Sequence, residues 1–126
     1  MRFPGRPRIL VIDDEKLVRD VITLILEKLG CRTTGFDSSR QAYEAFRDEP
    51  FEFDLVIADQ NMPGLTGTNL ALVMKAIRPD LPFIICTGKP CSDLTREAEL
   101  AGVNKVVGKP LGMIGLAGLL ETALKT

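Results

Sequence analysis

The sequence predicts an α/β fold, a parallel sheet with helices on both faces, and two observations support this fold class. Short apolar runs alternate with helical patterns five times from Arg8 onward. Three of these runs are nearly continuous in apolar residues, which is typical of strands covered on both faces. Strands that alternate with helices of this length form βαβ units, and their right-handed crossovers place helices on both sides of the sheet.

The expected strands are Ile9–Asp13, Arg32–Phe36, Leu55–Asp59, Phe83–Thr87 and Lys105–Gly108. The expected helices follow them in turn: Lys16–Leu29, 38–46, a third that contains Leu70 and Ile77 and is ended by Pro79, Asp93–Ala101 and Met113–Lys125. No internal repeat or low-complexity tract interrupts this alternation.

Local signals indicate where the helices begin and end. The first helix stops at Gly30 and has apolar side chains on one face: Val18, Ile22, Ile25 and Leu29. The segment Ser38-Ser39-Arg40-Gln41 is a capping box and starts the second helix. The third helix has apolar residues at helical spacing before Pro79 ends it: Leu70, Val73, Met74 and Ile77. The fourth closes at Gly102.

Composition narrows the class of protein. A length of 126 residues suits one domain with a full core. The net charge of −1 and a pI near 5.5 argue against a nucleic-acid-binding surface. The apolar runs are too short to span a membrane and no secretory segment follows Met1, so we expect a cytoplasmic protein. Residues 1–7 are expected to be a flexible leader or linker stub, and residues 8–126 the folded domain.

Cysteine and histidine usage excludes several kinds of site. Cys31, Cys86 and Cys91 are odd in number and lack CxxC spacing, so we expect free thiols. The chain contains no histidine. Catalysis by Ser-His-Asp or Cys-His groups and an imidazole zinc site within the chain are therefore excluded. Any phosphoryl group that the chain receives from a phosphohistidine must come from elsewhere.

Acidic residues follow two of the apolar runs where each strand ends. Asp13 and Asp14 follow the first run, and Asp59 ends the third. The carboxyl ends of parallel strands line the crevice where ligands bind, and neighbouring strands lie about 4.8 Å apart. If these two strands are neighbours, the three carboxylates share one pocket. Their mutual repulsion favours a hard cation such as Mg²⁺, beside which a carboxylate can accept a phosphoryl group.

Thr87 and Lys109 fall at the ends of the fourth and fifth strands and are expected in the same crevice. A hydroxyl there can donate to a phosphoryl oxygen, and an ammonium can neutralise one. Taken singly, each feature has a plainer explanation: Asp13-Asp14-Glu15 suits any helix N-terminus, and Asp59 could be a turn residue before Pro63-Gly64. Their joint occurrence at four strand ends favours a phosphoryl-accepting site.

The set Asp13-Asp14, Asp59, Thr87 and Lys109-Pro110 closely resembles the receiver domain of two-component response regulators. The resemblance covers about residues 8–125. It implies a flavodoxin-like, doubly wound (βα)5 fold with strand order 2-1-3-4-5. It also implies that Asp59 is phosphorylated, that Asp13, Asp14 and Asp59 hold Mg²⁺ with the backbone carbonyl of Asn61, that Thr87 shifts toward the phosphoryl group, and that Lys109 bridges to it. The Lys109–Pro110 bond is expected to be cis.

Three further segments look most like receivers at the C-terminal end of hybrid sensor histidine kinases: Leu55–Gly67, Arg78–Pro82 and Ile85–Gly88. The resemblance implies a phosphoacceptor that takes its phosphoryl group from a histidine kinase or phosphotransfer protein and catalyses its own phosphorylation and dephosphorylation. Alternatives are a stand-alone response regulator, or a receiver that binds proteins without phosphorylation. Output is expected through protein contacts, a kinase domain in the same chain, or a homodimer formed on phosphorylation.

Two positions depart from the family pattern. Val106 stands where many receivers have a switching aromatic, which places the usual coupling in doubt, and Lys89 stands near the path of attacking water. The final helix is expected to include Gly112, Gly115 and Gly118, each unfavourable in a helix interior by about 1 kcal/mol relative to alanine. Either packing by the leucines of that helix tolerates these glycines, or the glycines form a strip for close approach of a partner helix or a second copy.

Two readings from other classes fit less well. A flavodoxin-like cofactor binder should have a loop rich in Ser, Thr and Gly after the first strand, but Asp13-Asp14-Glu15 would repel a phosphate without a metal. An aspartyl phosphatase usually has a D-x-D-x-T arrangement after that strand, and the sequence lacks one.

Overall fold

The structure, a computed structural model, describes residue 3 and residues 5–124. Its strands are β1 Arg8–Ile12, β2 Arg32–Phe36, β3 Leu55–Asp59, β4 Phe83–Thr87 and β5 Lys105–Gly108. Its helices are α1 Lys16–Lys28, α2 Ser39–Asp48, α3 Gly67–Ile77, α4 Ser92–Leu100 and α5 Met113–Ala123.

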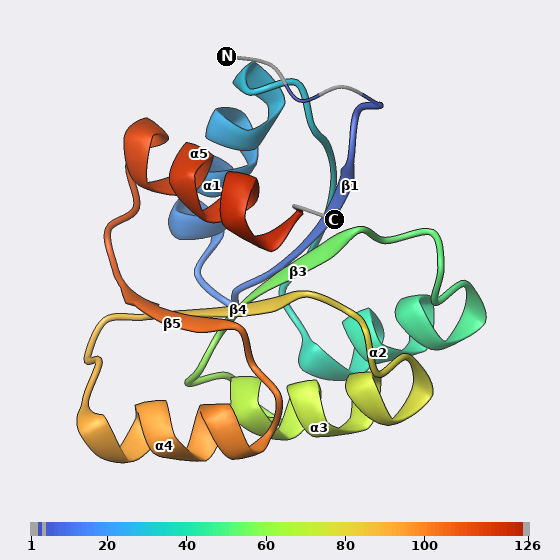
Figure 1. Cartoon of the computed structure of the whole chain (residues 1–126), viewed down its shortest axis with the longest axis vertical. Helices are drawn as coiled ribbons and strands as arrows, with labels where there is room; N and C mark the ends of the chain where they lie inside the picture. The colour runs from blue at the N-terminus through green and yellow to red at the C-terminus, as the bar shows by residue number, and fades with distance from the viewer. Residues whose placement is uncertain (1–2, 4, 125–126) are drawn as a thin grey trace.

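All neighbouring strands are parallel, and their order in the sheet is β2-β1-β3-β4-β5. Helices α1 and α5 cover one face, and α2, α3 and α4 cover the other (Figure 1). The predicted doubly wound α/β fold and its strand order are therefore confirmed. The order reverses beside β1, so the loops after β1 and β3 leave the same edge in opposite directions, which opens a crevice there.

Two hydrophobic cores hold the layers together, because successive side chains of a strand point to opposite faces. Ile9 and Val11 pack toward α1 and α5 with Leu26, Ile57, Ile84 and Leu116. Leu10 and Ile12 pack toward the other helices with Phe46, Val56, Met74 and Phe83. The central strands β3 and β4 are buried throughout, whereas the edge strands β2 and β5 are partly exposed.

Several element boundaries differ from the prediction. Helix α3 begins at Gly67, three residues before Leu70, the first residue of the predicted apolar pattern, and the Thr66 hydroxyl caps it by accepting from the Asn69 amide. Helix α5 begins at Met113 with Gly112 as its N-cap, so the expectation that Gly112 lies within the helix is wrong. The Ser38 hydroxyl does accept from the Gln41 amide, as the capping box predicts. The predicted helix end at Lys125 lies outside the described residues.

The described residues before β1 contact the domain. The Phe3 amide donates to the Leu29 carbonyl at 3.1 Å, and the Phe3 side chain packs on the core beneath α1 and α5. The Arg32 amide donates to the Pro7 carbonyl at 2.9 Å, which extends the pairing beside β2. A domain boundary at residue 8 stays our proposal.

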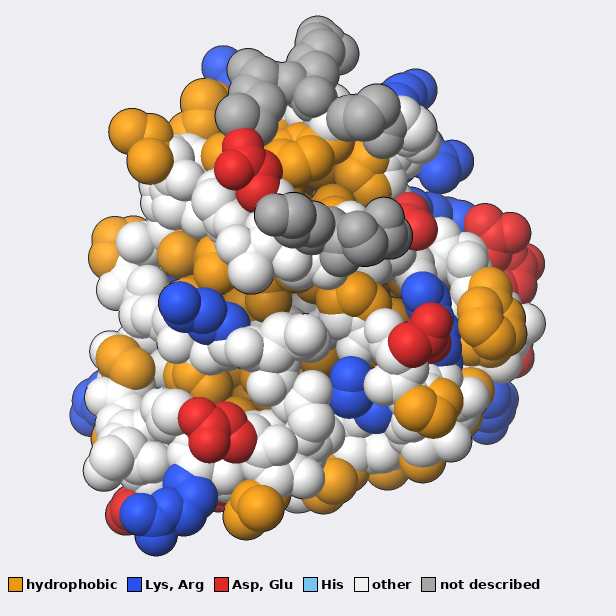
Figure 2. Space-filling view, in the orientation of Figure 1, with side chains coloured by type: hydrophobic (Ala, Val, Ile, Leu, Met, Phe, Trp, Pro, Cys, Tyr) orange, Lys and Arg blue, Asp and Glu red, His pale blue; other side chains and the backbone are white. Residues whose placement is uncertain are grey.

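Charges are mixed on the visible surface. Figure 2 shows acidic and basic side chains interspersed over this face, without a large area of one sign. Among the described residues, helices of sufficient length and hydropathy to cross a membrane are absent.

Candidate functional site at the carboxyl edge of the sheet

Strand register brings the predicted carboxylates together. Ile12 at the end of β1 pairs with Ala58 in β3, so Asp13 and Asp59 follow side by side. Carboxylate oxygens of Asp13, Asp14 and Asp59 all lie within 4.8 Å of one another. Asp13 and Asp59 are buried, whereas Asp14 is exposed. This oxygen-only donor set fits a hard divalent cation, as the sequence predicts.

Lys109 neutralises part of this cluster. Its Nζ lies 2.8 Å from Asp13 Oδ2, 3.3 Å from Asp59 Oδ1 and 3.9 Å from Glu15 Oε1. The backbone holds the lysine at the end of β5, because its amide donates to the Thr87 carbonyl at 2.8 Å. The Lys109–Pro110 peptide bond is cis, which confirms that prediction.

Burial and the attraction between opposite charges shift the pKa values of Asp59 and Lys109 in opposite directions. Burial raises the pKa of Asp59, the nearby Lys109 ammonium opposes this rise, and Asp13 adds to it, with a net increase above 3.8. Burial lowers the pKa of Lys109, but hydrogen bonding and attraction to Asp13 and Asp59 outweigh it, so the pKa is raised from 10.5. Lys109 is therefore protonated at neutral pH, and the site combines a permanent cation with crowded carboxylates.

The remaining predicted site residues line the same edge. Asp14, Asp59, Asn61, Lys89 and Lys109 all border a shallow pocket of about 390 Å³ that opens to solvent. Thr87 lies at the end of β4, where its hydroxyl is buried and accepts from the Lys89 amide at 3.3 Å.

Arg19 and Gly67 also shape the site, although their roles were not predicted from the sequence. Arg19 Nη1 donates to the Asp13 carbonyl at 2.7 Å, and its side chain passes over Gly35, where a Cβ would lie 3.4 Å from it. A Cβ at Gly67 would lie 2.7 Å from the Asp59 carbonyl oxygen, so only glycine allows helix α3 to start this close to the site. A basic residue on the first helix and a glycine at a helix start are common in sequences. Their roles at the site could therefore not be predicted from sequence pattern.

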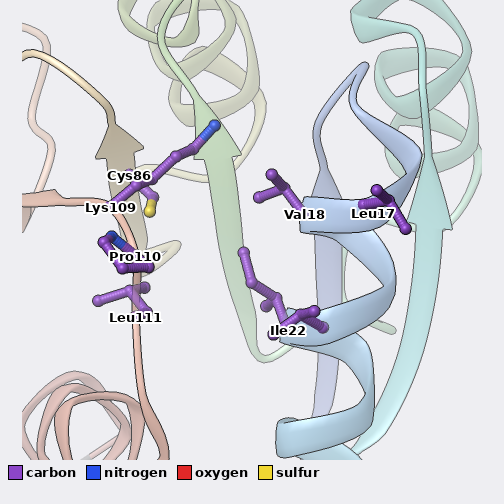
Figure 3. A pocket seen from close by; sticks show the side chains of 8 residues that line it. Leu17, Val18, Ile22, Cys86, Lys109, Pro110 and Leu111 are labelled. Atoms are coloured by element: carbon purple, nitrogen blue, oxygen red, sulfur yellow. The ribbon is translucent and has the colours of Figure 1, made fainter.

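An apolar groove of about 220 Å³ lies between α1 and the segment after β5, and Lys109 borders both this groove and the pocket beside Asp59. Val18 and Ile22 of α1 lie on one side of it, and Pro110 and Leu111 lie on the other (Figure 3). Leu17 also borders the groove. Figure 3 also shows the Lys109 side chain extending from this segment toward the end of β3. Cys86 lies in the wall, where burial raises the pKa of its thiol to about 11.

Curated relatives share this sequence over most of its length. The chain is 33% identical over 117 residues to the response regulator receiver protein CpdR of Brucella abortus, covering 93% of this chain and 96% of that protein. It is 35% identical over 109 residues to the chemotaxis protein CheY of Pseudomonas aeruginosa, covering 82% and 84%. For the transcriptional regulatory protein FixJ of Bradyrhizobium diazoefficiens, with 32% identity, the chain spans only 56% of that protein's length.

Solved structures show the same fold. A response regulator receiver domain from Clostridium thermocellum is 30% identical, superposes with a TM-score of 0.88 and is covered to 94%, as is this chain. The model of the response regulator receiver domain matches residues 9–121. With the strand order and the acidic edge already in place, these matches show that the chain belongs to the response regulator receiver domain family.

Proposed function

We propose that Asp59 is the phosphoacceptor of this receiver domain and that its phosphoryl group comes from a phosphohistidine. The observation that supports this most directly is the position of Asp59 at the end of β3, with its Oδ1 only 3.3 Å from the ammonium of Lys109 and other carboxylates close by. A carboxylate between a cation and a potential metal site can attack phosphorus without strong repulsion from the incoming anion.

The side chains of the site have different roles in this phosphoryl transfer. An Asp59 oxygen bonds to phosphorus as the phosphorus–nitrogen bond breaks, and the imidazole leaves with the electron pair. Lys109 neutralises a phosphoryl oxygen, and the Thr87 hydroxyl donates a hydrogen bond after a local shift. Asp13, Asp14, Asp59 and the Asn61 backbone carbonyl would hold Mg²⁺, which supplies neutralising charge for the phosphoryl oxygens.

Dephosphorylation is the hydrolysis of the phosphorylated Asp59. Water attacks phosphorus and releases Asp59, and we propose that Lys89 at the pocket edge tunes this step. Replacement Lys89→Ala should change the rate at which the phosphorylated protein loses its phosphoryl group. An unchanged rate would leave Lys89 as a solvated surface charge.

The donor must be a separate histidine-bearing protein or domain, because this chain contains no histidine. On α1, Leu17, Val21 and Leu24 are 80%, 52% and 55% exposed at helical spacing beside the apolar groove. We propose that a helix carrying the phosphohistidine packs here, because an apolar contact at this point would bring the imidazole to Asp59. The donor is then a histidine kinase or a phosphotransfer protein.

Two parent contexts are proposed. The segments Leu55–Gly67, Arg78–Pro82 and Ile85–Gly88 resemble receivers of hybrid sensor histidine kinases and favour that origin. The coverage of 96% of CpdR and 84% of CheY favours a stand-alone regulator as the second candidate. The gene sequence upstream of Arg8 distinguishes them, since a kinase domain there would establish the hybrid context.

Location and assembly are proposed from the cysteines and from one solved receiver domain. The free thiols of Cys31, Cys86 and Cys91 are typical of a reducing compartment, so we propose a cytoplasmic location. A receiver domain solved as a beryllofluoride-activated dimer, from the protein NtrC4, is 25% identical with a TM-score of 0.87. We propose that phosphorylation promotes a homodimer of this chain as well.

Direct phosphorylation tests the function. Incubation with acetyl phosphate and Mg²⁺ should add one phosphoryl group, measured by intact mass, and Asp59→Asn should abolish it. Equal labelling of Asp59→Asn would show that another residue accepts the group. Absence of labelling in the wild type would instead favour a receiver that binds partners without phosphorylation.

A further inference from the structure

The buried hydroxyl of Ser39 makes its contacts outside its own helix. Ser38 is the N-cap of α2 and its side chain accepts from the Gln41 amide. Ser39, the next residue, is 1% exposed, so its hydroxyl needs partners within the protein. It finds both on the loop between β3 and α3, a segment more than twenty residues away in the chain.

Two hydrogen bonds join Ser39 to this loop in opposite senses. Its Oγ donates to the Pro63 carbonyl at 3.1 Å and accepts from the Leu65 amide at 2.9 Å. Gly64 lies between these two groups with φ of +87°, and a Cβ there would be 3.0 Å from the Ser39 oxygen. The loop thus closes tightly around one hydroxyl, and glycine provides both the backbone conformation and the space.

The same loop leads to the carboxylate site. Asn61 borders the solvent-open pocket with Asp14 and Asp59, and the Met62 side chain that follows is buried in the core. Three residues, 60–62, separate Asp59 from Pro63, the first residue of the loop that Ser39 contacts by a hydrogen bond. A loop released at Pro63 and Leu65 could move the Asn61 peptide relative to Asp13 and Asp14.

We propose that Ser39 is a positioning residue for the metal site: its hydroxyl fixes the loop that presents the Asn61 carbonyl beside the carboxylates. This inference rests on the proposed function, in which that carbonyl is a Mg²⁺ ligand. It assigns a role in cation binding to helix α2, whose residues do not border the pocket around Asp59.

Titration of the whole chain with MgCl2 in a calorimeter tests the inference. Ser39→Ala should weaken Mg²⁺ binding by about fivefold, the effect expected when a hydrogen-bonded contact of average strength no longer supports the bound state. Labelling by acetyl phosphate should need more Mg²⁺ in this variant but reach the wild-type rate at saturation. Ser39→Cys, which is close in size but a poor hydrogen-bonding group, should behave in the same way and serves if the alanine variant folds poorly.

Ser38→Ala is the matched control, because the Ser38 hydroxyl caps the same helix, whereas the hydrogen bonds to Pro63 and Leu65 come from Ser39. It should lower the melting temperature and leave Mg²⁺ affinity unchanged. Wild-type affinity in both Ser39 variants would overturn the inference and leave Ser39 with a structural role only. Failure of the proposed function has a different signature: the wild type itself would not bind Mg²⁺, or Asp14→Ala would bind it equally well.

Discussion

At the scale of single residues, the site holds three carboxylates close together. Asp13 and Asp59 are buried within reach of each other, and one lysine compensates them. The raised pKa of Asp59 shows that burial and Asp13 outweigh the attraction of Lys109. Shifted pKa values of this kind are common where a protein binds a charged ligand, because the bound ligand compensates the charge of the protein groups.

The ionised form of Asp59 should therefore destabilise the protein in the absence of metal. Because its pKa in the folded state lies above 3.8, the folded state binds more protons, and this group makes stability fall as pH rises from 3.8 through the raised pKa. In EDTA at neutral pH, Asp59→Asn should melt a few degrees higher than the wild type, and the difference should vanish below pH 3.8. Calorimetric melting across this range is the measurement, and an Asn variant that melts lower at neutral pH would contradict it.

Removal of the metal should lower the melting temperature of the wild type. A ligand that binds only the folded state stabilises it by about 2.7 kcal/mol when its concentration is about 100 times Kd. Millimolar Mg²⁺ should raise the melting temperature of the wild type, EDTA should reverse the rise, and Asp14→Ala should respond less. Asp14 suits this test because its side chain is exposed and its loss leaves the core intact. The same response in both proteins would show that Asp14 is not a ligand.

At the scale of elements, the strands were predictable within one residue. The clearest were β3 and β4, which are apolar up to their last residues, Asp59 and Thr87. Helix starts were less predictable. Nothing in the apolar periodicity marks Thr66 as the cap of α3, and the close approach of Gly67 to Asp59 depends on how that helix packs. The contacts of Ser39 with Pro63 and Leu65 join distant segments, so local pattern could show Ser39 only as part of a capping box.

Helix α1 should affect phosphotransfer through its exposed apolar face. Leu17→Glu should slow transfer from a phosphohistidine donor by about tenfold, since it places a charge in an apolar contact. Labelling by acetyl phosphate, which needs no docking helix, should be unchanged. Leu100→Glu is the matched control, because Leu100 is similarly exposed, at 82%, but belongs to α4 on the opposite face. Equal slowing by both variants, or by neither, would place the donor elsewhere.

At the scale of the whole molecule, the order of the strands decides the site. Apolar periodicity predicted alternating strands and helices, but only the family resemblance indicated that β1 lies beside β3. That adjacency brings Asp13 to Asp59, and β4 and β5 add Thr87 and Lys109 at the same edge. The sequence pattern therefore predicted the candidate residues on the condition that β1 and β3 are neighbours. The strand order of the folded sheet meets that condition and brings the residues together.

We propose that Val106 on β5 and the glycines of α5, which lie far from Asp59 in sequence, belong to a surface that contacts other proteins. Val106 is half-buried against the core beneath α2–α4, and as a β-branched aliphatic residue it offers no aromatic ring to rotate. On α5, a Cβ at Gly118 would have no neighbour within 4 Å, and one at Gly115 would meet only Leu111 at 3.9 Å. Internal packing thus does not require these two glycines, and both border a groove of about 370 Å³ beside Lys105.

If the groove accepts a second copy, bulky residues there should block self-association. We expect the wild type activated with beryllofluoride to dimerise, and Gly115→Leu/Gly118→Leu to stay monomeric, in sedimentation measurements. Gly115→Ala/Gly118→Ala is the control: it should be stabilised by up to about 1 kcal/mol per site, because alanine favours helix, and should still associate. All three proteins should be labelled by acetyl phosphate, since the strip is separate from Asp59. An activated wild type that stays monomeric would mean that the glycines are only tolerated, because the leucines of α5 hold the helix on the sheet regardless.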